Sequence, residues 1–140
     1  MNRYDEYRER TQKRYNEFPQ GFAFSTKQLE EQMQKLGVTD KSELVGIGHG
    51  GFIRKTDKQA YLNMMQEINK ELETLIADDK DGSEFICDMF YSELNNHEYS
   101  YTYDIEDTLD ALGYTESDIQ NDKRLANALS KAIAKIVGEE

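Results

Sequence analysis

A chain of 140 residues can hold one hydrophobic core but is too short for two, so the sequence predicts a single domain over residues 1–140. Its formal net charge of −11 disfavours direct binding to nucleic acid or to an anionic membrane. One cysteine, Cys87, excludes an intrachain disulfide, and no apolar run is long enough to span a membrane. We therefore expect a cytoplasmic protein.

Residues 1–18 are predicted to form an N-terminal amphipathic helix. Its core-facing positions recur at helical spacing: Tyr4, Tyr7, Thr11, Tyr15 and Phe18. Pro19 ends this helix because proline has no amide hydrogen to donate. The segment 22–54 then combines short strands at 22–24, 45–48 and 51–54 with a helix that Ser25 begins and Gly37 ends.

A glycine-rich turn separates the last two of these strands. The spacing Gly46-x-Gly48-x-x-Gly51 matches a dinucleotide-binding fingerprint, but residues 52–55 intervene before the next helix. No helix N-terminus would then lie at the glycines to receive a pyrophosphate, so we predict a β-hairpin instead. His49, Phe52 and Arg54 of this hairpin form a possible second binding surface.

Residues 57–137 are predicted to form an acidic helical region. Its longest helix, 57–77, carries an apolar stripe over five turns and is expected at the centre of the core. Shorter helices follow near 84–98, 104–112 and 115–120, and a last one runs from 122 to 137. A tyrosine-lined connection joins the first two of these. The predicted fold is α+β and mostly α, with five or six helices around a central long helix and a two- or three-stranded antiparallel sheet.

The stretch from Asp81 to Asp122 contains twelve acidic residues and no lysine or arginine. Exposed helices usually mix charge signs, because opposite charges one turn apart attract. Carboxylates one turn apart are about 5–6 Å from each other, close to the phosphate spacing of a nucleic-acid strand. The predicted partner is a basic or nucleic-acid-binding protein. The predicted contact residues are Glu84, Asp88, Glu98, Tyr101, Tyr103, Asp104, Asp107 and Asp110. A surface that only keeps the protein in solution is the alternative.

No catalytic residue, cofactor or metal site is predicted. The two histidines, His49 and His97, are too far apart in sequence to form a zinc-binding motif. Asp79, Asp81 and Gly82 resemble part of a calcium loop, but that alignment puts Ala77 where the first carboxylate belongs. An enzyme of unknown class remains an alternative, and it requires a pocket in which a histidine meets other polar groups.

Several segments resemble a family of uncharacterised small acidic proteins that phages and mobile elements of Gram-positive bacteria carry. The segments are 14–18 (Arg-Tyr-Asn-Glu-Phe), 22–25 (Phe-Ala-Phe-Ser), 50–55 (Gly-Gly-Phe-Ile-Arg-Lys), 88–99 (Asp-Met-Phe-Tyr-Ser-Glu-Leu-Asn-Asn-His-Glu-Tyr) and 107–113 (Asp-Thr-Leu-Asp-Ala-Leu-Gly). By analogy, the resemblance implies a counter-defence role in a bacterial host cell, such as anti-CRISPR or anti-restriction inhibition.

Together, the charge pattern and this resemblance predict a non-enzymatic inhibitor. Its acidic surface would occupy the basic nucleic-acid-binding groove of a host protein. The alternative is a housekeeping or adaptor module of a mobile element that binds its partner through the tyrosines and the glycine hairpin. The sequence predicts neither an oligomeric state nor the identity of the partner.

Overall fold

The computed structural model describes residues 2–139, and its contacts divide the chain into two compact units. The helical unit comprises Met1–Arg10 and Glu71–Glu140, and the sheet unit comprises Thr11–Lys70. The boundary falls within two helices, α1 (Arg3–Glu17) and α3 (Lys58–Asp78). The sequence predicted one domain over 1–140 with a first helix over 1–18. Met1 and Glu140, where those predictions begin and end, lie outside the described residues.

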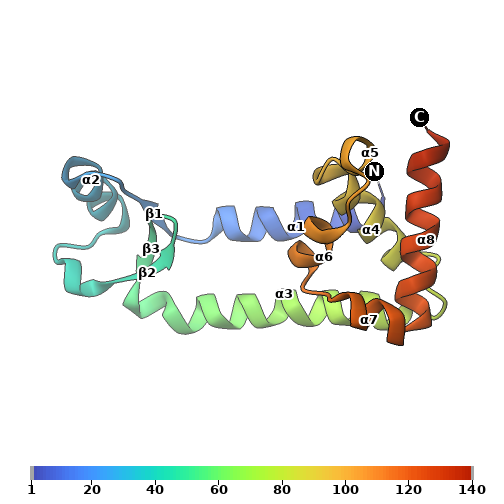
Figure 1. Cartoon of the computed structure of the whole chain (residues 1–140). Helices are drawn as coiled ribbons and strands as arrows, with labels where there is room; N and C mark the ends of the chain where they lie inside the picture. Colours follow the sequence, from blue (N-terminus) through green and yellow to red (C-terminus); the bar gives the residue numbers. More distant parts are fainter. Residues whose placement is uncertain (1, 140) are drawn as a thin grey trace. The chain divides into compact units, whose positions relative to one another are not determined.

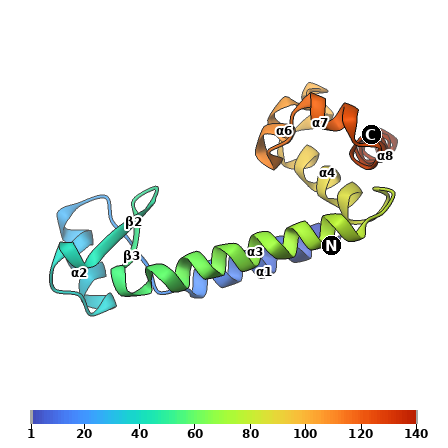
Figure 2. The ribbon, with the colours of Figure 1, turned by 90° about the horizontal axis from the view of Figure 1, so that it is seen from below.

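The sheet unit contains a three-stranded antiparallel sheet in the order β1-β3-β2 (Figure 1). Its strands are β1 (Gly21–Phe22), β2 (Leu44–Gly48) and β3 (Gly51–Arg54), close to the predicted 22–24, 45–48 and 51–54. The helix α2 (Thr26–Leu36) packs against β1. Figure 2 shows α2 near the hairpin of β2 and β3. Ser25 caps its start by accepting a hydrogen bond from the amide of Gln28, as the sequence predicted.

The glycine-rich segment forms the predicted hairpin between β2 and β3. Its two turn residues, His49 and Gly50, have φ angles of 54° and 79°. Positive φ at both turn residues is typical of a type I′ turn, whose twist matches that of the flanking strands. The chain then passes through a short 3₁₀ turn, η2 (Lys55–Asp57), before α3 begins, so no helix N-terminus lies at the glycines.

A small core supports the sheet unit. Leu36, Val38 and Phe52 are buried together, at the end of α2 and on β3. Between α2 and β2 the chain forms another 3₁₀ turn, η1 (Lys41–Glu43). Phe18 packs edge-on against Tyr61, with ring centroids 5.2 Å apart, which joins the end of α1 to the first part of α3 inside this unit.

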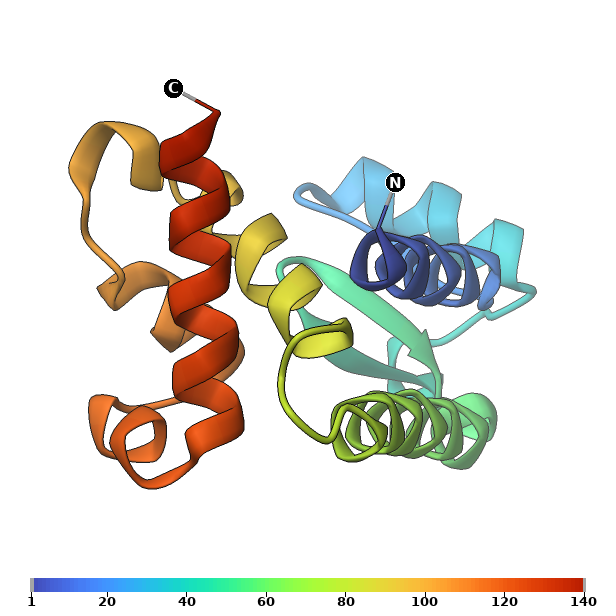
Figure 3. The same cartoon turned by 90° about the vertical axis from the view of Figure 1, so that its right-hand side faces the viewer.

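The helical unit is organised around two helices that lie side by side, α4 (Phe85–Asn96) and α8 (Lys123–Gly138). Figure 3 shows α8, in red, beside α4, in yellow. Their buried side chains include Phe85, Ile86, Met89, Phe90 and Leu94 from α4, and Leu125, Leu129 and Ile136 from α8. The sequence placed the 57–77 helix at the centre of the core, but α3 contributes only Met64 and Ile68 to the buried set.

Three short helices complete the helical unit: α5 (Tyr99–Thr102), α6 (Glu106–Leu112) and α7 (Glu116–Asn121). The predicted class, mostly helical α+β with a small antiparallel sheet, is confirmed. Residues 2–139 contain eight α-helices, whereas the sequence predicted five or six around the long helix. The added helix is α5, since the tyrosine-lined connection forms one helical turn. Across residues 2–139, no helix combines the length and the apolar character needed to cross a membrane.

Candidate functional site

Exposed carboxylates of α6 and α7 form the least neutralised part of the acidic stretch. We define the acidic surface as Asp104, Glu106, Asp107, Asp110, Glu116 and Asp118, all of which are exposed. Within residues 2–139, no lysine, arginine or histidine forms an ion pair with any of these carboxylates. Three of the predicted contact residues, Asp104, Asp107 and Asp110, belong to this surface.

Four of the six residues of the acidic surface line an open depression of about 400 Å³. Asp104, Glu106, Asp110 and Glu116 line its rim, while Leu109 and Tyr114 are among the less polar residues that line it. Leu109 is buried and Tyr114 is half-buried. Burial raises the pKa of Tyr114, and the negative charge of Asp122 raises it further. The depression therefore joins four carboxylates to an apolar patch, a combination suited to a basic side chain with a long aliphatic stem.

Local sequence signals place all of these carboxylates except Asp110 at helix N-termini. Asp104 accepts a hydrogen bond of 2.9 Å from the amide of Glu106, at the first residue of α6. Gly113 ends α6 with a φ of 78°, and Thr115 and Asp118 then form a capping box that begins α7. Acidic side chains in a first helical turn are stabilised by the helix dipole. Asp104 and Asp118 thus also serve the fold, whereas the carboxylate of Asp110 has no hydrogen-bond or ion-pair partner among the described residues.

Two of the predicted contact residues face the N-terminal helix instead of the acidic surface. The carboxylate of Glu84 lies 3.9 Å from the guanidinium of Arg3. Asp88 is half-buried and accepts a hydrogen bond of 3.2 Å from the backbone amide of Arg3. These acids therefore hold the first turn of α1 against α4 inside the helical unit.

The predicted tyrosines lie next to the acidic surface in the chain. Tyr101 is 84% exposed and Tyr103 is 61% exposed, at the end of the one-turn helix α5. Glu98 and Tyr103 flank α5 with φ angles of 58° and 55°, in the left-handed region. Tyr103 packs edge-on against Tyr99, with ring centroids 5.8 Å apart. This geometry presents Tyr101 to solvent three residues before Asp104.

The possible second surface on the hairpin does not form as predicted. His49 is exposed at the tip, but Phe52 is only 8% exposed and lies in the core of the sheet unit. Arg54 donates to the carboxylate of Asp57 at 2.7 Å and to the carbonyl of Leu36 at 3.3 Å. Residues 51–53 of β3 are all buried, Phe52 among them, and Arg54 links elements within the unit, so His49 alone keeps the predicted exposure.

A buried polar cluster was not predicted. The side chain of Glu93 on α4 is only 7% exposed. Its carboxylate accepts hydrogen bonds from Tyr4 and from Arg8, each at 2.8 Å, and lies 3.4 Å from the imidazole of His97. Asp5, Arg8, Glu9 and Asn96 line a wide, shallow depression near this cluster. The cluster supplies hydrogen-bond partners to a buried carboxylate and fixes α1 on α4. The other histidine, His49, belongs to the sheet unit.

The segment that resembles part of a calcium loop has a structural role in this chain. Asp79 is only 3% exposed, and its carboxylate accepts hydrogen bonds from the amides of Gly82, Glu84 and Ile86 at 2.9 to 3.1 Å. It therefore caps the start of α4. In the part of the chain that the structure describes, no group of three or more histidine, cysteine or acidic residues is placed to hold a metal ion.

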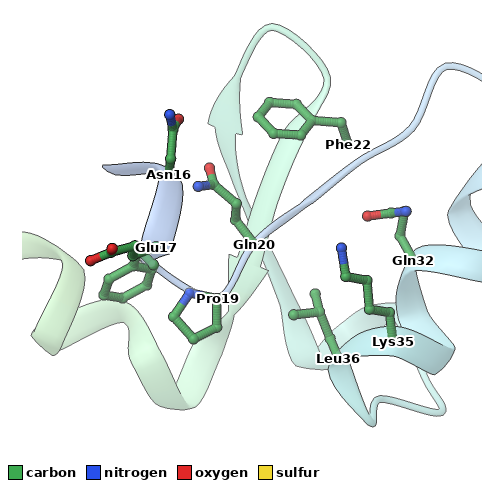
Figure 4. Close-up of a pocket in the computed structure, with 9 residues that line it drawn as sticks. Asn16, Glu17, Pro19, Gln20, Phe22, Gln32, Lys35 and Leu36 are labelled. Atoms are coloured by element: carbon green, nitrogen blue, oxygen red, sulfur yellow. The ribbon is translucent and has the colours of Figure 1, made fainter. Parts of the chain in front are cut away.

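The sheet unit has a depression of its own, of about 520 Å³ (Figure 4). It lies between the segment after α1, β1 and α2, and contains none of the predicted site residues. Several of its polar side chains serve local structure. Gln20 donates to the carbonyl of Tyr15, Asn16 accepts from Gln12, and Glu17 lies 3.8 Å from Lys13. The unneutralised carboxylates of the helical unit therefore remain the strongest candidate site.

The chain belongs to DUF7659, a family of unknown function, whose model matches residues 3–135. No curated protein and no solved structure matches the chain. The family covers both units, so the acidic surface and the sheet unit are parts of one family architecture.

Proposed function

We propose that this protein is a non-enzymatic, acidic protein-binding protein that uses the acidic surface to occupy a basic nucleic-acid-binding groove of a host protein. The observation that carries the proposal is the separation of charge between the two units. The helical unit holds 21 acidic and eight basic residues, whereas the sheet unit holds seven acidic and nine basic residues. A field of one sign concentrated on one unit attracts and orients a partner of the opposite sign.

The depression within the acidic surface adds support at the level of single contacts. A phosphate-binding groove presents lysine and arginine side chains, and these pair well with carboxylates. Four carboxylates surround this depression, and Leu109 and Tyr114 offer apolar contact to the aliphatic part of such side chains. On the resemblance drawn from the sequence, we propose a counter-defence inhibitor of the anti-CRISPR kind, carried by a phage or mobile element.

The experiment uses the immobilised full-length protein to capture proteins from host lysate, followed by elution with duplex DNA. We expect a captured protein that binds DNA and that DNA releases, because both ligands would occupy one groove. Asp107→Asn/Asp110→Asn should capture less of it, since both side chains are exposed and neither caps a helix. Glu30→Gln/Glu31→Gln on α2 removes the same charge from the sheet unit and should capture as the wild type does.

A captured protein that DNA does not release, and that both double variants retain equally, would contradict the proposal. The exposure of Tyr101 favours a second candidate, the adaptor that binds through its tyrosines. That alternative predicts that Tyr101→Ala abolishes capture while Asp107→Asn/Asp110→Asn leaves it unchanged. Phe52 no longer belongs to this alternative, because it is buried.

A further inference from the structure

The sheet unit has a free strand edge. β2 is the last strand in the order β1-β3-β2, and in residues 2–139 no other strand pairs with its outer edge. Backbone N–H and C=O groups along such an edge can pair with an added strand. The register with β3 is regular from Leu44 to Gly46 and shifts between Gly46 and Gly48. The straight part of the free edge is therefore 44–46.

An apolar groove of about 340 Å³ lies between β2 and α3. The apolar residues that line it are Val45, Ile47, Ile53, Tyr61, Leu62 and Met65. Leu62 is 41% exposed, which is high for a large apolar side chain beside a sheet. In a strand added to β2, every second side chain would point toward α3 and could enter this groove.

The rim of the groove is cationic. Lys58 is the one charged residue that lines it, and no acidic residue within the described range forms an ion pair with Lys58. The acid that precedes Lys58 in the chain, Asp57, is already engaged, because it accepts a hydrogen bond from Arg54. A carboxylate on the occupant would therefore find an available partner at Lys58.

We infer that this groove binds an extended peptide segment of a partner protein, which adds a fourth strand to the sheet at β2. The segment places apolar side chains against Leu62 and Met65 and a carboxylate at Lys58. Main-chain hydrogen bonds supply affinity in this mode, and the groove selects the side chains at alternate positions. A second copy of this chain fits less well, since its own β2 edge brings another unpaired Lys58 where a carboxylate is favoured. The site is distinct from the acidic surface and does not depend on the proposed function.

The test uses end-blocked synthetic peptides and the amide NMR spectrum of the full chain. One peptide alternates valine with glutamate, one alternates valine with lysine, and a third carries a proline at the centre of the valine–glutamate sequence. We expect the valine–glutamate peptide to shift the amides of 44–46 and to bind about threefold or more tighter than the lysine peptide. The proline peptide should bind weakly, because it loses a main-chain hydrogen bond.

Three variants separate the contributions of charge and of apolar contact to peptide binding. Lys58→Glu should reverse the preference between the two charged peptides, and Leu62→Ser should weaken both about tenfold because the groove loses its apolar contact. Lys27→Glu, with the same charge change at an exposed position on α2, should leave binding unchanged. Unaltered amide shifts outside the groove would establish that the variants remain folded.

Three results would overturn the inference. The first is the absence of shifts at 44–46 with every peptide, and the second is equal binding of the two charged peptides. The third is a concentration-dependent dimer whose formation shifts the amides of 44–46, since a second copy would then occupy the edge.

Discussion

Tyr4 of α1 donates its phenolic hydrogen to the carboxylate of Glu93 on α4 across 2.8 Å, and both side chains are buried. The two residues are 89 positions apart in the sequence. Arg8 donates to the same carboxylate oxygen. This contact closes the first part of α1 onto the core of the helical unit, and its removal should be measurable in two ways.

Tyr4→Phe should lower the free energy of unfolding. The variant keeps the ring but removes a hydrogen bond to a charged acceptor, which typically contributes about 1.5–3 kcal/mol. Urea unfolding followed by circular dichroism measures the change. Tyr101→Phe removes a hydroxyl from a side chain that is 84% exposed and should have little effect. Equal effects of the two substitutions would show that the contact with Glu93 does not stabilise the fold.

The same contact predicts a loss of stability at high pH. Burial raises the pKa of Tyr4 well above its ordinary value of 10.0, and the hydrogen bond to Glu93 raises it further. A group whose pKa is higher in the folded state stabilises the fold fully below the unfolded-state pKa and loses that contribution as pH rises through the folded-state pKa. The unfolding free energy of the wild type should therefore fall above pH 10 more steeply than that of Tyr4→Phe. Parallel pH profiles would contradict this.

Local signals in the sequence predicted most of the secondary structure. The cap at Ser25, the end of α2 at Gly37 and the hairpin around His49 all depend on residues within a few positions of each other. Interactions of this range can be inferred from spacing, because each side chain serves its own turn or helix end. The acidic residues of α6 could be placed on an exposed helix face in the same way, because their spacing within one helix is a local signal.

The contacts between distant segments could not be predicted in this way. Glu93 looks like one more residue of an acidic helix, and its burial depends on Tyr4 and Arg8 at the other end of the sequence. Asp79 and Asp81 are equally good capping residues by type, and only the path of the loop selects Asp79. The central position of α4 depends likewise on its packing with α8.

Gly82 and Gly113 provide a matched pair of substitutions for testing the path of the loop between α3 and α4. Both have φ near 80°, where a residue with a side chain is strained by about 1–2 kcal/mol. A Cβ at Gly113 meets nothing within 4 Å, whereas a Cβ at Gly82 would clash with the backbone carbonyl of Arg124. Gly82→Ala should therefore destabilise the protein clearly more than Gly113→Ala, as measured by thermal unfolding. Similar melting temperatures for the two variants would contradict the close approach of Gly82 to the carbonyl of Arg124.

Asp110→Asn should stabilise the protein slightly. Asp110 lies one turn after Asp107 and near the C-terminal end of α6, where the helix dipole disfavours negative charge. Relief of these repulsions should add a few tenths of a kcal/mol to the unfolding free energy at low salt. The gain should shrink when unfolding is measured at high salt, which screens exposed charges. A marked loss of stability would mean that Asp110 supports the fold.

Cys87 should react slowly with thiol reagents. It is half-buried, and its burial raises the pKa of the thiol, with a further contribution from the charge of Asp88. The thiolate is the reactive form, so a raised pKa leaves less of it at neutral pH. Reaction of the folded protein with a chromogenic disulfide should be slower than reaction after unfolding in urea. Equal rates would show that the fold does not protect the thiol.

The salt dependence of binding tests the central claim most directly. The affinity of the full-length protein for the captured DNA-binding partner should fall about tenfold or more between about 50 and 200 mM salt, because the contacts are between opposite charges. Asp107→Asn/Asp110→Asn should bind more weakly at low salt and depend less on salt, while Glu30→Gln/Glu31→Gln should follow the wild type. An affinity that neither salt nor the Asp107→Asn/Asp110→Asn substitutions change would contradict a function carried by the acidic surface.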